Sequence, residues 1–171
     1  MKNYKLFIIL GWIFTSLVAT SVVLPIHYNE LRNQESPPNP EQPIGEIVLG
    51  TSVVQSLGNL ENNLKGIKVL FATYQRSNTC NIEVEVWKEP LFINLIHKET
   101  VPCSNLKDNS YAEFLFDNQP ESSAQKYYLV LRSDGTNGNA VTVWSSLKVS
   151  RDELYINNEK KPIKLVVLPI Y

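Results

Sequence analysis

The sequence predicts an all-β protein, an antiparallel β-sandwich that is preceded by one transmembrane helix. From Ile44 onward, short runs of β-branched and aromatic residues are separated by clusters of Asn, Asp, Gly and Pro. Such runs are typical of strands, and no run there shows the 3.6-residue period of an amphipathic helix. About eight to ten strands at this spacing favour a jelly-roll-like sandwich over a barrel. The helix is predicted by an uncharged apolar stretch near the N-terminus.

The apolar stretch, residues 6–26, is long enough to cross a bilayer. It holds 21 residues without a charge, and about 20 helical residues span the hydrocarbon core. Lys2 and Lys5 precede it, so the positive-inside rule places residues 1–5 in the cytoplasm and the C-terminal bulk outside. A cleaved signal peptide is the alternative, because residues 19–21 are small enough for a cleavage site. We predict a retained anchor, and hence a single-pass protein of the cell membrane.

Residues 27–43 read as a proline-rich spacer. Its prolines, Pro37, Pro38, Pro40 and Pro43, remove backbone donors and favour polyproline II. Such a segment is semi-rigid and extends about 3.1 Å per residue. We therefore expect it to hold an extracytoplasmic domain, residues 44–171, away from the bilayer.

The strands of this domain follow from local composition. We predict strands at residues 46–49, 52–57, 66–74, 80–87, 92–101, 111–116, 126–132, 140–145, 154–156 and 163–168. Alternation is clearest at residues 82–86, where apolar side chains should face the core while Glu83 and Glu85 face water.

The two cysteines fit one hairpin. Cys80 opens one predicted strand and Cys103 follows the next, and a turn centred near residues 91–92 sets the two directly opposite each other. The same register places Val84 opposite Glu99, so a hairpin interrupted by a bulge is the alternative. Because an exported domain meets an oxidising compartment, we predict a structural disulfide, with two buried free thiols as the alternative.

Composition argues against several functional classes. The chain has 16 basic and 17 acidic side chains, and a nucleic-acid binder needs a surplus of Lys and Arg.

His97 is the only histidine of residues 44–171, and we interpret it as a solvated strand residue. Glu83 and Glu85 lie about 7 Å apart on one strand face, within the range of glycosidase carboxylates, but we interpret them as solvated. We expect no enzyme and no cofactor.

A metal site is also not expected. Asp134, Asn137 and Asn139 form an oxygen-rich loop of the kind that holds Ca²⁺, but it has only one full charge. We interpret this loop as a plain turn.

Aromatic residues are the candidates for ligand contact. Trp87 should point to the Glu83 and Glu85 side of its strand, and an exposed Trp or Tyr can stack on the apolar face of a sugar ring. Together with residues that end strands or border loops, it forms our candidate ligand-binding set: Trp87, Tyr74, Arg76 and Trp144. The alternative is that the aromatic side chains simply pack in the core or at a sheet edge.

Four segments together, residues 70–78, 108–111, 125–128 and 138–144, carry a resemblance. In this order they resemble bacterial extracytoplasmic β-sandwich modules that occur with membrane glycosyltransferases and other cell-surface polysaccharide proteins. The resemblance implies a sandwich fold and a surface location, and it brings no catalytic residues. Cys80 and Cys103 stand where it leads us to expect small residues, and the two departures together favour the disulfide.

These observations predict a membrane-anchored, non-enzymatic binding or accessory module at the outer membrane surface, with a cell-surface glycan as its ligand. The alternative is an accessory subunit that docks on a larger membrane protein complex such as a glycosyltransferase. Small residues in the apolar stretch, Gly11, Thr15, Ser16 and Ala19, offer a surface for such helix contact.

Overall fold

The computed structural model describes residues 38–89, 91–147 and 152–171. The expected cytoplasmic N-terminus, the predicted membrane-spanning segment and most of the expected spacer lie outside these residues. None of the helices in the described part is long and apolar enough to cross a bilayer.

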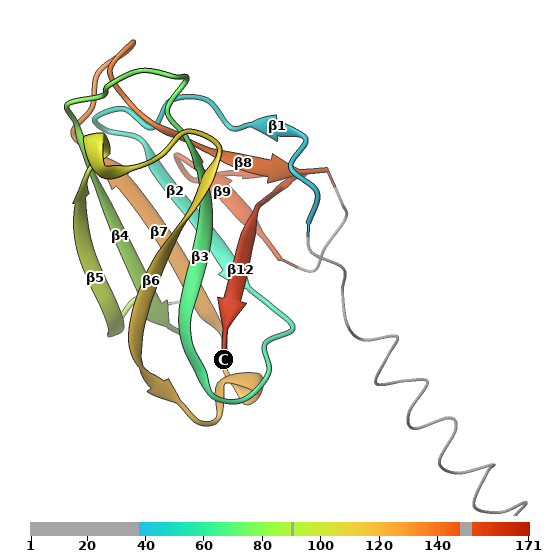
Figure 1. Ribbon diagram of the computed structural model, residues 1–171. Helices are drawn as coiled ribbons and strands as arrows, with labels where there is room; N and C mark the ends of the chain where they lie inside the picture. Colours follow the sequence, from blue (N-terminus) through green and yellow to red (C-terminus); the bar gives the residue numbers. More distant parts are fainter. Residues whose placement is uncertain (1–37, 90, 148–151) are drawn as a thin grey trace, which may run out of the picture. The chain divides into compact units, whose positions relative to one another are not determined.

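Two antiparallel sheets make up the fold (Figure 1). Sheet A contains β1 (Gln42–Pro43), β3 (Leu64–Ala72), β6 (Ser110–Gln119), β8 (Thr142–Ser146), β11 (Lys164–Leu165) and β12 (Val167–Ile170). Sheet B contains β2 (Ser52–Leu57), β4 (Asn81–Lys88), β5 (Asn94–Pro102), β7 (Tyr127–Ser133), β9 (Leu154–Ile156) and β10 (Glu159–Lys161). Short 3₁₀ turns occupy Cys103–Asn105 and Ser122–Ala124. The predicted all-β, antiparallel sandwich is confirmed, and its jelly-roll-like character stays a prediction.

The strand order brings distant segments together. Sheet B runs β10-β9-β2-β7-β4-β5, and sheet A runs β1-β8-β3-β12, with β6 beside β3 and β11 beside β8. Strands β7 and β4, which are separated by β5 and β6 in the chain, are therefore neighbours in the interior of sheet B. This neighbourhood positions the candidate site described below.

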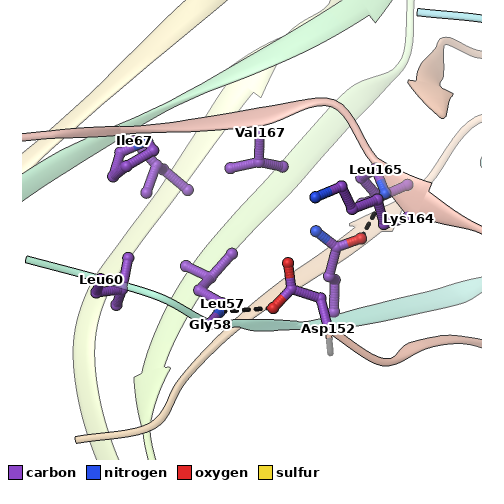
Figure 2. A pocket seen from close by; sticks show the side chains of 10 residues that line it. Leu57, Gly58, Leu60, Ile67, Asp152, Lys164, Leu165 and Val167 are labelled. Atoms are coloured by element: carbon purple, nitrogen blue, oxygen red, sulfur yellow. Dashed lines mark hydrogen bonds between the residues drawn. The ribbon is translucent and has the colours of Figure 1, made fainter. Parts of the chain in front are cut away.

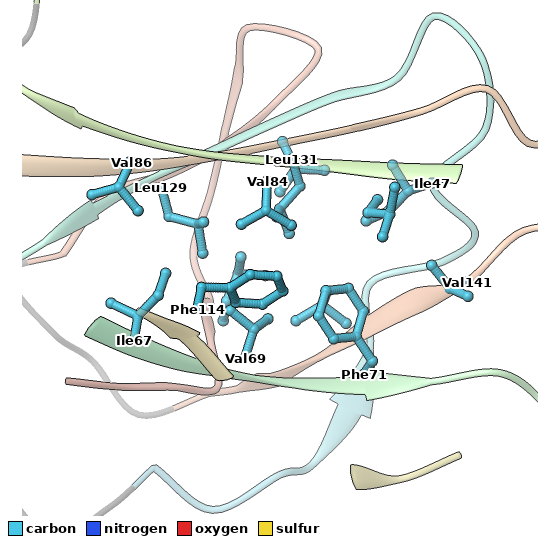
Figure 3. Close-up of a cluster of buried hydrophobic side chains, with 14 of the residues drawn as sticks. Ile47, Ile67, Val69, Phe71, Val84, Val86, Phe114, Leu129, Leu131 and Val141 are labelled. Atoms are coloured by element: carbon cyan, nitrogen blue, oxygen red, sulfur yellow. The ribbon is translucent and has the colours of Figure 1, made fainter. Parts of the chain in front are cut away.

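The core fills the space between the sheets (Figure 3). Apolar residues of β4 and β7 face apolar residues of β3 and β6, and all of them are fully buried: Val84, Val86, Leu129, Leu131, Ile67, Val69, Phe71 and Phe114. Full burial of such a side chain stabilises the fold by about 1.5–3 kcal/mol. The alternation predicted for residues 82–86 is thus confirmed on its inner side.

Segment 46–49 is not a strand, contrary to expectation. Ile47 is buried in the core, and its N–H donates to Val141 O at 2.9 Å, so the segment does lie along sheet A. However, Gly45 and Gly50 flank it with φ values of 98° and 86°. These left-handed turns end any extended ladder on both sides.

Strand β1 lies inside the segment that the sequence analysis assigned to the spacer. Gln42 and Pro43 pair with Ser145 and Trp144 of β8 at the edge of sheet A. An edge position tolerates proline, because its missing N–H leaves no ladder donor unpaired. Pairing with the sandwich therefore begins before Ile44.

Strand β10 was not expected, because its residues Glu159–Lys161 are all charged. It pairs with β9 through a two-residue turn in which Asn157 and Asn158 have φ values of 53° and 66°. Two consecutive positive φ values are typical of the type I′ turn, which asparagine tolerates. Here the turn creates the strand, and apolar patterning does not.

The disulfide between Cys80 and Cys103 is confirmed, with a Cα–Cα distance of 5.2 Å. The register is also the predicted one, since Val84 lies opposite Glu99. A bulge does occur, between Val86 and Trp87, close to the turn. The hairpin of β4 and β5 is therefore closed covalently at its open end.

His97 is not a solvated strand residue, and this expectation is wrong. Its ring packs 5.9 Å from the Phe116 ring and 6.4 Å from the Phe114 ring, centroid to centroid. Its Nε2 is buried without a hydrogen bond, 3.4 Å from a Glu99 carboxylate oxygen. The reason is that the inner side of edge strand β5 lies against β6 of the opposite sheet.

Candidate functional site

The outer face of sheet B carries Trp87 of the ligand-binding candidates, together with Glu83 and Glu85. Along β4, Glu83, Glu85 and Trp87 alternate with the core residues, and the register with β7 sets Arg132 beside Glu83 and Tyr128 beside Trp87. We call this surface the sheet B face; it consists of Asn81, Glu83, Glu85, Trp87, Lys98, Thr100, Tyr128 and Arg132.

Two aromatic rings form one end of the sheet B face, and a third ring packs against them. Trp87 and Tyr128 are cross-strand neighbours, and both are half-buried. Phe92, from the loop between β4 and β5, packs edge-on against both rings, at centroid distances of 5.9 Å to Trp87 and 5.7 Å to Tyr128. The expectation that Trp87 lies on the glutamate side is confirmed, because its Nε1 donates to Glu85 Oε2 at 2.8 Å.

A four-residue ion network occupies the middle of the sheet B face. Lys98 Nζ lies 2.6 Å from Glu83 and 3.0 Å from Glu85, and Arg132 lies 3.5 Å and 2.9 Å from the same two carboxylates. The Glu85 side chain is only 6% exposed. The prediction that both glutamates face water is therefore wrong for Glu85. Long side chains from both neighbouring strands reach its carboxylate, and alternation along one strand does not reveal them.

The surroundings of Glu85 determine its ionisation. Burial by itself raises the pKa of this carboxyl, but hydrogen bonds from Trp87, Lys98 and Arg132 outweigh burial and lower the pKa to about 2. A carboxyl with such a pKa stays ionised at neutral pH and does not supply a proton as a general acid must. The three hydrogen bonds hold the Glu85 carboxylate in place, so the geometry favours a positioning role for this residue.

An open depression continues from the ion network toward the disulfide end of β4. Its volume is about 250 Å³, and it is lined by Asn81, Glu83, Thr100, Arg132, Ser133 and Asp134. Asp134 accepts hydrogen bonds from the Asn81 N–H at 2.6 Å and from its amide at 2.8 Å. These bonds lower the pKa of Asp134, so its carboxylate is ionised. They also hold the carboxylate against Asn81 at the edge of the depression.

In the oxygen-rich loop, Asp134 and Asn139 use their side-chain oxygens in hydrogen bonds within the chain. Asp134 binds Asn81, and Asn139 accepts a hydrogen bond from the Thr79 N–H at 2.7 Å. Among the residues that the structure describes, no three His, Cys, Asp or Glu side chains are grouped to hold a metal ion.

Tyr74 and Arg76 lie in the turn after β3, away from Trp87. Tyr74 has a φ of 56°, and the guanidinium of Arg76 lies 4.8 Å from the centre of its ring. Asp108 accepts hydrogen bonds from the Thr73, Gln75 and Tyr74 N–H groups, which lower its pKa. Arg76 also pairs with Glu46. The turn is thus held by carboxylates that sequence inspection did not select.

Trp144 belongs to the other sheet. It follows the inward-facing Val143 on β8, and its Nε1 donates to Asn109 Oδ1 at 2.9 Å. Asn109 in turn bonds Asp108, which links Trp144 to the Tyr74 turn. The structure therefore brings Tyr74, Arg76 and Trp144 into one region and leaves Trp87 on the sheet B face.

Sequence reasoning missed the partners of Trp87. Tyr128, Lys98 and Arg132 reach it or its neighbour Glu85 only through the pairing of β4 with β7 and β5. One signal was present, because alternation through β7 sends either Tyr127 or Tyr128 to the outside. Nothing local says that this outside position lies next to Trp87.

A separate cavity lies between β2 with the loop after it and the strands β11 and β12 of sheet A (Figure 2). Its volume is about 50 Å³, which suits water-sized molecules only. Gln55 Oε1 accepts a hydrogen bond from the Leu165 N–H at 2.5 Å, and Asp152 accepts one from the Gly58 N–H at 2.7 Å. The cavity is too small for a sugar.

No protein-family model and no curated protein matches this chain. Among solved structures, a xylan-binding module, CBM15, is 12% identical at a TM-score of 0.40, covering 63% of this chain and 76% of that chain. A Xylanase10C mutant from Cellvibrio japonicus in complex with xylopentaose is 12% identical at a TM-score of 0.38, covering 72% of this chain and 25% of that chain. The infectious bursal disease virus VP2 subviral particle is 11% identical at a TM-score of 0.28, covering 78% and 32%. Likenesses at this level assign no function.

Proposed function

We propose that this protein is a membrane-anchored, non-enzymatic binding module whose sheet B face recognises a cell-surface glycan. One observation carries the proposal. The neighbouring rings of Trp87 and Tyr128 stand in line with an open depression lined by hydrogen-bonding side chains, on the strands of one sheet. Sites on strands are held more precisely than sites on loops.

The two parts of the face match the two sides of a sugar. A pyranose presents C–H groups on one face, and these are attracted to the electron-rich face of an aromatic ring. Its hydroxyls lie at the rim, where Arg132, Glu83 and Asn81 supply donors and acceptors. Trp87 is already fixed by its bond to Glu85, so binding costs little side-chain entropy.

Charge and length narrow the ligand class. Lys98 and Arg132 are each paired with both Glu83 and Glu85, so the network has no net charge and favours a neutral glycan over an acidic one. Trp87 lies six positions after Asn81, which is roughly 20 Å along a strand. A surface of this length fits an oligosaccharide better than a single sugar.

The test is binding of the full-length, detergent-solubilised protein to a panel of neutral and acidic bacterial polysaccharides. Trp87→Ala should weaken binding about tenfold or more, which corresponds to about 1.4 kcal/mol of lost contact. Trp144→Ala is the matched control, since this tryptophan lies on the other sheet, and it should bind as the wild type does.

Two results would count against the proposal. Equal binding by the wild type and the Trp87→Ala protein would remove the glycan from the sheet B face. Absence of binding to every polysaccharide in the panel would refute glycan recognition as such.

A further inference from the structure

Exposed apolar side chains are concentrated at the turn of the β4–β5 hairpin. Leu91 is 74% exposed, Ile93 70%, Leu95 45% and Phe92 39%. Of the ten large hydrophobic side chains that are exposed in the described residues, these four come from one short segment. We call them the hairpin patch. Clustering of this kind, unlike single exposed residues, marks a contact surface.

The hairpin patch is held in place. The Glu89 N–H donates to Lys126 O at 2.9 Å, which ties the turn to the chain just before β7. The Phe92 ring packs against Trp87 and Tyr128. Leu91 and Ile93, on either side of this ring in the sequence, nevertheless remain in solvent. The fold therefore presents two aliphatic side chains from a braced turn.

The layering of side chains around the turn fits the surface of a bilayer. Aliphatic residues form the outermost layer, and behind them lie Trp87 and Tyr128, the residue types favoured at the membrane–water interface. Lys88 and Lys126 lie beside the turn with the carboxylate of Glu89, and Glu153 is close enough to interact with Lys126. With so little net charge, apolar insertion rather than electrostatic attraction would hold the turn at the surface.

The chain itself argues that a bilayer is the partner. The apolar stretch that predicts an anchor ends at residue 26, and the described domain begins at residue 38. Eleven residues lie between them, and a polyproline II segment of that length would reach roughly 35 Å. That is comparable to the diameter of a domain of this size, whose radius of gyration is about 14 Å. A short tether keeps the domain at high local concentration near the bilayer, so a small patch is sufficient.

We propose that the hairpin patch inserts into the surface of a phospholipid bilayer, so that the domain rests on the membrane to which the chain is anchored. The inference rests on the anchoring part of the proposed function and is independent of glycan binding. It would place the aromatic end of the sheet B face nearest the lipid and the depression farther from it.

The test uses the full-length protein reconstituted into phosphatidylcholine vesicles. Both native cysteines are in the disulfide, so Leu91→Cys supplies one reactive thiol for an environment-sensitive fluorophore. Leu49→Cys is the matched control. Leu49 is 73% exposed, and it precedes β2 at the end of sheet B that lies away from the β4–β5 turn. The label at position 91 should shift to the blue and be quenched at least twofold by lipids that carry a quencher in the upper acyl chain. The label at position 49 should show the emission of a fluorophore in water and no quenching by these lipids.

A second change tests the patch itself. Ile93→Ser, combined with the label at position 91, should reduce the lipid quenching, whereas added salt should change it little. Water-like emission at both positions overturns the proposal, and so does a blue shift without lipid quenching, which would indicate a protein partner or a second copy.

Flotation of the protein with the vesicles is scored separately. A chain that floats with a water-exposed label at 91 refutes only the hairpin contact, whereas a chain that does not float refutes the anchor.

Discussion

At the scale of single residues, Glu85 organises the sheet B face. Its carboxylate accepts hydrogen bonds from the indole of Trp87, the ammonium of Lys98 and the guanidinium of Arg132. Without it, the indole N–H would have no partner on the face, and the two cations would have only Glu83. A buried charge of this kind is acceptable because its bonds replace those it made to water.

Stability should depend on pH through Glu85. The pKa of its carboxyl is lowered from 4.5 to about 2 in the folded protein, so its contribution is complete above pH 4.5 and is lost as the pH falls toward 2. The shift corresponds to roughly 3 kcal/mol. Glu85→Gln should therefore lower the unfolding free energy at pH 7 by roughly 2 kcal/mol and flatten its decline between pH 4.5 and 2. Urea unfolding at a series of pH values measures both.

The control for the Glu85→Gln substitution is a change in an exposed ion pair, Lys68 with Glu113. Glu113→Gln should cost less than about 1 kcal/mol, because solvent already screens that pair. A Glu85→Gln protein that keeps the full acid slope of the wild type would show that other carboxyls cause it.

At the scale of elements, the β4–β5 hairpin connects the proposed site to the rest of the sandwich. Its disulfide closes one end, its turn carries the hairpin patch, and β4 contributes the central row of the sheet B face. The bulge next to Trp87 falls in the pairing with β5 only. The pairing of β4 with β7 therefore stays regular where Trp87 meets Tyr128.

Removal of the disulfide should destabilise this hairpin measurably. The two cysteines are 23 residues apart, and closing a loop of this size restricts the unfolded chain by on the order of 3 kcal/mol. The Cys80→Ser, Cys103→Ser double variant should lose about that much in denaturant unfolding. Reductant should cause the same loss in the wild type and none in the double variant. An unchanged unfolding midpoint in the reduced wild type would contradict this account.

At the scale of the whole molecule, one apolar layer holds the two sheets together. Phe114 of β6 lies in that layer and packs 6.4 Å, centroid to centroid, from Phe71 of β3. Both rings are fully buried. Substitutions in this layer therefore affect the complete sandwich, including the sheet B face on its far side.

Phe114→Ala should lower the unfolding free energy by about 3–5 kcal/mol, because it leaves a cavity between the sheets. Leu115→Ala is the control on the adjacent position, where the side chain is exposed, and it should change stability by less than about 0.5 kcal/mol. Thermal or denaturant unfolding measures both variants. Equal losses would mean that the inner and outer sides of β6 are not distinct.

The sequence by itself determined the features that depend on neighbours in the chain. β2 and β9 were predicted with their observed bounds, and the pairing of Cys80 with Cys103 followed from the turn between two adjacent strands. In each case, alternation and turn chemistry act over a few residues.

Only the tertiary structure decided which strands are neighbours, and with that the candidate site. Arg132 helps to bury Glu85, His97 packs against Phe116, and Trp87 pairs across strands with Tyr128. Each of these relations joins strands that are not consecutive in the chain or lie in different sheets. β1 formed for the same reason, since β8 of sheet A supplied its hydrogen bonds; β10, by contrast, depends on the local turn at Asn157 and Asn158. Local patterning specifies which side of a strand faces inward, but the order of strands in a sheet depends on packing of the complete core.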